Sequence, residues 1–85
     1  MKVKLNKLDV GIIVNSLSQT KTEITEYTVE EVNIVLLKWL ITHEEMNDKE
    51  EKIVIDELEF PLVLKSLNLF RKKQIRDVYK TRDIR

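Results

Sequence analysis

The sequence predicts a small α+β fold that is predominantly helical, with the element order β-α-α-β-α. Two stretches fifty positions apart, 2–19 and 52–69, share one pattern of polar and apolar residues. Each stretch opens with strand-like alternation and continues with helical spacing, and a strongly apolar segment at about 28–46 lies between them. With 85 residues, the chain has the length of a single domain, 1–85. We therefore expect a pseudo-repeat of strand-helix units, with two short strands in a small ribbon and three helices.

The first unit carries local signals for a strand and then a helix. In the alternating segment 2–5, Val3 and Leu5 share one side, as strand residues do. Asn6 then stands at a helix N-cap, and Asp9, three residues later, completes a capping box. Leu5 before the cap and Val10 after it form a hydrophobic staple.

The second unit repeats these features with Asp56 as the cap and Glu59 as its partner. Gly11 and Pro61 occupy equivalent positions, five residues past each cap. Proline removes a helical hydrogen bond, and glycine weakens a helix by about 1 kcal/mol. An alternative is therefore that each cap opens a separate tight turn and the main helices begin at Gly11 and Pro61.

The central segment is the clearest helix, because Thr28 and Glu31 form a capping box before a long apolar run. From Val32 to Ile41, apolar residues point in almost every direction, which predicts burial from several sides. Two flanking helices are expected to leave part of this helix bare, which favours a partner. Trp39 is expected in the core; if exposed, it is a candidate interface residue.

The last helix is expected from about Pro61 to Tyr79. Arg71 falls within its apolar face, and Lys21 matches it in the first unit. An unpaired buried guanidinium is very costly, so Arg71 is expected to be exposed or paired with an acid at an interface. The apolar face is predicted to comprise Phe60, Val63, Leu64, Leu67, Phe70 and Val78.

Charge is segregated along a chain whose formal net charge is zero. Segment 23–59 holds twelve acids and three lysines, whereas residues from Lys65 onward include eight basic and two acidic side chains. Such asymmetry indicates a binding surface, or two copies of the chain that face each other.

The basic residues of the last helix suggest a second function, nucleic-acid binding. A basic stripe of this kind can follow a phosphate backbone. However, the chain is neutral overall, and it has no helix-turn-helix glycine turn and no RNA-stacking aromatic motif. A solvated face or a protein contact is the favoured interpretation. The candidate residues for nucleic acid or for a partner are Lys65, Lys72, Lys73, Arg76 and Lys80.

Catalytic motifs are scarce. The chain has no cysteine, and Asn47 replaces the second histidine that a zinc motif beginning at His43 needs. Gly11 is the only glycine, so no glycine-rich phosphate loop is present. The serines lack a nearby base and the glycine-flanked elbow of a nucleophile. We expect no enzyme activity, no cofactor and no metal site.

These observations together predict a non-enzymatic module that binds and modulates another protein and also forms a homodimer. No segment reaches transmembrane length and no targeting segment is evident, so we expect a cytoplasmic protein without membrane contact. The composition, rich in Lys, Ile, Asn and Glu and free of Cys, resembles that of small accessory proteins of low-GC Gram-positive bacteria and their phages.

Overall fold

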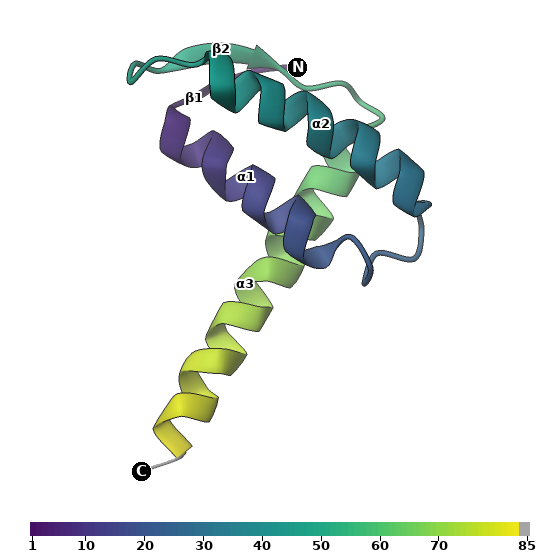
Figure 1. Ribbon diagram of the computed structural model, residues 1–85, viewed down its shortest axis with the longest axis vertical. Helices are drawn as coiled ribbons and strands as arrows, with labels where there is room; N and C mark the ends of the chain where they lie inside the picture. The colour runs from purple at the N-terminus through teal and green to yellow at the C-terminus, as the bar shows by residue number, and fades with distance from the viewer. Residues whose placement is uncertain (84–85) are drawn as a thin grey trace.

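The computed structural model describes the backbone of residues 1–83 and the side chains of residues 1–76. It has the predicted element order and the predicted α+β class (Figure 1). The central helix and both strands lie within two residues of their expected positions, and the last helix continues past its expected end. The elements are β1 (Lys2–Leu5), α1 (Lys7–Thr20), α2 (Val29–Glu45), β2 (Glu51–Val54) and α3 (Phe60–Asp83).

The two strands form an antiparallel ribbon in which Val3 faces Ile53 and Lys4 faces Lys52. Ile53 is buried beneath the ribbon, whereas both of these lysines are exposed. The N-terminal ammonium of Met1 donates to the carbonyl of Ile55 at 3.2 Å, and the Ile55 N–H donates to the Met1 carbonyl at 2.8 Å. The two units are therefore joined through their strands.

α1 begins at the predicted cap and runs through Gly11 without interruption. The Asp9 N–H donates to Oδ1 of Asn6 at 2.8 Å, and the Asn6 N–H donates to Oδ2 of Asp9 at 3.2 Å. This complete capping box satisfies N–H groups that the first turn leaves without partners. The alternative start at Gly11 is therefore wrong for the first unit.

The second unit behaves differently at the equivalent place. The residues after Asp56 form a separate turn, and α3 begins at Phe60, one residue before Pro61. Proline has no N–H to donate to the carbonyl four residues before it, so this turn cannot carry the full helical ladder. The alternative of a separate turn is correct here to within one residue.

The core lies where α1 packs against both α2 and α3 (Figure 1). Trp39 is fully buried in it, which confirms its expected place in the core. The predicted apolar face of α3 is wrong in part, because Leu62 and Val63 are buried whereas Phe60 and Leu64 are exposed. The C-terminal half of α3 projects away from the other elements. Among the described residues, no helix combines the length and apolarity needed to cross a membrane.

Candidate protein-binding surface

The side of α2 opposite Trp39 is apolar and faces solvent. We call Ile34, Leu37, Leu40 and Ile41 the α2 face; these side chains are between 41% and 70% exposed. Buried residues such as Val32 and Trp39 lie on the other side of the helix, toward α1. Apolar residues occur on both sides of α2, but the packing of this chain buries only the side that carries Val32 and Trp39. Large apolar side chains gathered on one exposed side are typical of an interaction surface.

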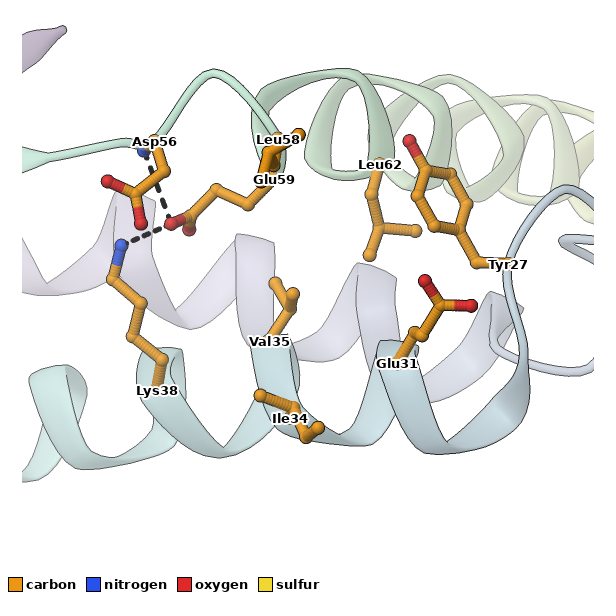
Figure 2. Close-up of a pocket in the computed structure, with 9 residues that line it drawn as sticks. All are labelled: Tyr27, Glu31, Ile34, Val35, Lys38, Asp56, Leu58, Glu59 and Leu62. Carbon is orange, nitrogen blue, oxygen red and sulfur yellow. Dashed lines mark hydrogen bonds and ion pairs between the residues drawn. The ribbon is translucent and has the colours of Figure 1, made fainter.

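An apolar groove of about 440 Å³ adjoins the α2 face. It lies between α2 and the turn that precedes α3, and Ile34 belongs to both the groove and the α2 face (Figure 2). Leu58, which is 88% exposed, stands on the opposite wall. The lining residues are Tyr27, Glu31, Ile34, Val35, Lys38, Asp56, Leu58, Glu59 and Leu62.

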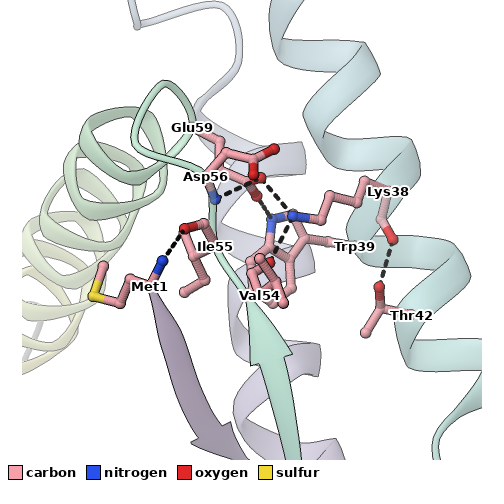
Figure 3. A network of polar contacts seen from close by, with 8 residues as sticks. All are labelled: Met1, Lys38, Trp39, Thr42, Val54, Ile55, Asp56 and Glu59. Atoms are coloured by element: carbon pink, nitrogen blue, oxygen red, sulfur yellow. Dashed lines mark hydrogen bonds and ion pairs between the residues drawn. The ribbon is translucent and has the colours of Figure 1, made fainter.

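A buried carboxylate fixes one end of this groove (Figure 3). Glu59 is 6% exposed, and its Oε1 accepts from Trp39 Nε1–H at 2.9 Å. Its Oε2 accepts from Lys38 Nζ at 2.5 Å and from the Asp56 N–H at 3.2 Å. Lys38 Nζ also donates to the Val54 carbonyl at 2.9 Å. The network therefore ties α2, β2 and the start of α3 together, and it gives the groove a fixed wall.

Acidic side chains stand at both ends of the α2 face. Glu30 and Glu31 lie in the first turn of α2, Glu44 and Glu45 lie in its last turn, and all four are exposed. Asp56, also exposed, lies on the far side of the groove. Lys38 is the basic side chain that lines the groove, and its charge is matched by Glu59. The surface is therefore apolar in the middle and negative around it.

The predicted basic stripe of α3 is divided in the structure. Lys65 forms an ion pair with Glu26, and its hydrogen bond to that carboxylate lowers the pKa of Glu26. Lys73 pairs with Glu23 at 2.6 Å and donates to the Gln19 carbonyl at 3.1 Å.

The rest of the stripe has no such acidic partner among the described side chains. Lys72 and Arg76 are exposed, and the side chain of Lys80 lies outside the described residues. Arg71 is exposed, as expected. It makes no ion pair with any described side chain.

The serine hydroxyls and the histidine imidazole considered as catalytic groups do not form a nucleophile-base pair among the described side chains. Ser16 and Ser66 are fully buried and donate to carbonyls of their own helices, Ile12 at 2.7 Å and Val63 at 2.8 Å. His43 is half-buried, with Nε2 3.5 Å from where a Cβ on Gly11 would lie. Within the described part of the chain, no three His, Asp or Glu side chains are grouped as metal ligands would be.

The groove was missed by sequence reasoning, although the α2 face leaves a signal. Ile34, Leu37 and Ile41 follow the helical spacing of three and four on the side opposite Trp39. The groove gives no such signal, because Leu58 and Leu62 reach α2 only through the tertiary fold. Comparison with protein-family models, with curated proteins and with solved structures finds no match for this chain.

Proposed function

We propose that this protein is a non-enzymatic interaction module that binds an amphipathic helix of another protein along the α2 face and its groove. The α2 face carries the proposal. Four large apolar side chains remain exposed there while the opposite side of the same helix builds the core. Covering such a surface removes apolar area from water, which is the main favourable term in protein association.

The form of the surface favours a helix as the ligand. The α2 face spans about 10 Å of helix length, which matches roughly two turns of a helix lying alongside it. The adjoining groove, with Leu58 and Leu62 on one wall and Ile34 on the other, accepts a large apolar anchor side chain. Helix-in-groove recognition uses this combination of an apolar stripe and inserted anchors, and a buried anchor contributes most of the binding energy.

The charges around the surface define the chemistry of the ligand. Acids at both ends of α2 favour basic residues beside the apolar stripe of the partner helix. A second α2 is disfavoured, because antiparallel pairing would bring Glu30 and Glu31 beside Glu44 and Glu45 of the other copy. The proposed partner is therefore a different helix, apolar on one side with lysine or arginine at its flanks.

The test uses two synthetic amphipathic helices of about five turns, with one leucine stripe and either lysine or glutamate flanks. Each peptide is titrated into isotope-labelled protein, and backbone amide shifts are followed by NMR. We expect the lysine peptide to shift signals of α2 and of residues 56–62, and the glutamate peptide to bind at least about ten-fold more weakly. Equal binding of both peptides, or no binding of either at about 1 mM, would contradict the proposal.

Matched variants locate the binding. Leu37→Glu is expected to weaken the lysine peptide at least about ten-fold, since it places a charge in the centre of the α2 face. Leu8→Glu introduces the same charge at an exposed leucine of α1 and is expected to leave binding unchanged. If the two variants lose affinity equally, binding on the α2 face is wrong.

Duplex DNA provides the competing experiment. We expect no shifts at moderate salt, because Lys65 and Lys73 are matched by Glu26 and Glu23. Binding that falls steeply with salt and is lost in Lys72→Glu/Arg76→Glu would assign a nucleic-acid function to α3 instead.

A further inference from the structure

α3 carries a second exposed stripe that the interaction module does not use. We call Glu57, Phe60, Leu64, Leu67, Arg71 and Ile75 the α3 seam. Phe60, Leu64, Leu67, Arg71 and Ile75 lie three or four residues apart, so they share one side of α3 over about 22 Å. Glu57 lies in the turn just before the helix. Phe60, Leu64 and Ile75 are 38%, 47% and 46% exposed, and Leu67 is half-buried. Glu57 and Arg71 are exposed at opposite ends of the leucines.

The first unit shows how such a stripe is covered when a neighbour is present. Val10, Val14 and Leu17, fifty positions before Phe60, Leu64 and Leu67, are buried or half-buried in α1. α1 packs against both other helices, whereas α3 packs chiefly against α1 through its Leu62 and Val63 side. Within the described residues, Phe60 and Leu64 are therefore exposed in the second unit, whereas Leu67 packs partly against the core.

We propose that the α3 seam is the interface of a homodimer in which two α3 helices pack antiparallel. A parallel pair would place Arg71 beside Arg71 and Glu57 beside Glu57, which repel. In the antiparallel pair, Leu64 of each copy meets Leu67 of the other. The Leu64–Leu67 contacts form the centre of the interface. On either side of them, the end of one seam that carries Glu57 lies beside the end of the other seam that carries Arg71.

This register gives Arg71 an acidic partner, which it lacks among the described side chains of the single chain. With Leu64 against Leu67, Arg71 lies opposite Phe60 of the second copy. Glu57 of that copy is three residues before this phenylalanine, in the turn that leads into α3. The planar guanidinium stacks on the aromatic ring and bonds the carboxylate. Two-fold symmetry makes each contact twice, so the pairing closes at two chains. An arginine within an apolar stripe is thereby explained.

The shape of the chain suits this arrangement. The C-terminal half of α3 projects from the body (Figure 1), while its N-terminal half packs against α1. Antiparallel pairing places each body beside the projecting half of the other helix, where there is room for it. A helix pair of this length lies at the small end of specific interfaces, so we expect a dimer with a dissociation constant in the micromolar range.

Charge swapping tests the register by analytical ultracentrifugation over a range of concentrations. Glu57→Arg and Arg71→Glu are each expected to weaken the dimer at least about ten-fold, because each brings like charges together twice. The double variant has the original net charge and is expected to restore the dimer. Lys72→Glu, the same charge change one residue from the seam, is the control, and we expect it to stay dimeric.

Three outcomes would overturn the inference. The first is a strict monomer at about 1 mM, and the second is a double variant no more dimeric than the single ones. The third is a dimer that ignores both swaps and dissociates in Leu37→Glu, which would place self-association on the α2 face. Peptide binding to the α2 face is measured separately, so failure of the dimer leaves the proposed function standing.

Discussion

The two strand-helix units share one sequence pattern, yet they bury different sides of their helices. Several equivalent positions behave alike, and others do not. Val10 is fully buried whereas its equivalent Phe60 is exposed, and exposed Ile12 corresponds to fully buried Leu62. The pairs that agree include Ile13 with Val63 and Ser16 with Ser66, which are buried, and Leu8 with Leu58, which are exposed.

The difference follows from the number of neighbours that each helix has. α1 packs against both other helices, so the side that includes Val10 and Leu17 is enclosed. In α3 the buried side is rotated toward Leu62, because the start of this helix packs against α1 and Leu62 lines the groove beside α2. A repeated pattern therefore predicts repeated elements, while the packing partners decide which apolar residues become core.

The largest difference between the units is expected at Asp9 and Glu59, which occupy the same capping position. Asp9 only returns a bond to the Asn6 N–H, whereas the longer Glu59 also reaches Trp39 and Lys38. We expect Glu59→Ala to lower the free energy of unfolding by about 3 kcal/mol, because it leaves the buried indole N–H without its acceptor and Lys38 without its counter-charge. Asp9→Ala is expected to lower it by about 1 kcal/mol.

Urea unfolding of both alanine variants measures this contrast in the free energy of unfolding. Glu59→Gln is the matched control, since the amide oxygen still accepts one bond while the charge is removed. We expect its loss of stability to fall between those of the two alanine variants. Equal losses for Glu59→Ala and Asp9→Ala would show that Glu59 acts only as a cap.

The rotated core side gives a second contrast. Leu62→Ala is expected to lower the free energy of unfolding by about 3 kcal/mol, since a fully buried leucine leaves a cavity. Ile12→Ala, at the equivalent exposed position, is expected to change it by less than about 1 kcal/mol. Thermal unfolding followed by circular dichroism compares the two. A larger loss for Ile12→Ala would mean that this side of α1 is covered in solution.

Local signals explain what the sequence could predict. The capping boxes of α1 and α2 join residues three positions apart, and the apolar run of α2 is a continuous helical pattern. Such signals set the element order, both helix starts and the burial of Trp39. The separate turn at Asp56 was foreseen as an alternative, because the effect of Pro61 is also local. The duplication of the two units stays a prediction.

What the sequence could not predict depends on contacts between distant segments. The Trp39–Glu59 bond joins residues twenty positions apart, and the groove exists only because Leu58 and Leu62 fold back beside Ile34. Helical spacing places Phe60 and Leu64 near Val63, so it could not show that they are exposed while Leu62 is buried. The groove and the exposure of Phe60 and Leu64 were therefore visible only in the folded chain, whereas the α2 face left a signal in the sequence.

The smallest contrast concerns the link between α3 and the loop after α1. Lys65 pairs with Glu26, whereas its equivalent in α1, Asn15, has no charge. The hydrogen bond from Lys65 lowers the pKa of Glu26 below its ordinary value of 4.5. The folded state therefore binds fewer protons at this site than the unfolded chain does. Stability from the pair is present above the unfolded pKa and is lost as pH falls through the folded pKa.

Lys65→Met removes this contribution, so we expect a small loss of stability at neutral pH that fades in acid. In acid the Glu26 carboxyl group is protonated in both the variant and the original chain, so the ion pair no longer makes their stabilities differ. Urea midpoints measured between about pH 7 and pH 3 follow the change. Asn15→Met is the matched control in α1, and its effect is expected to stay constant with pH. A loss in Lys65→Met that persists unchanged at the acidic end would mean that the loss does not come from the ion pair with Glu26.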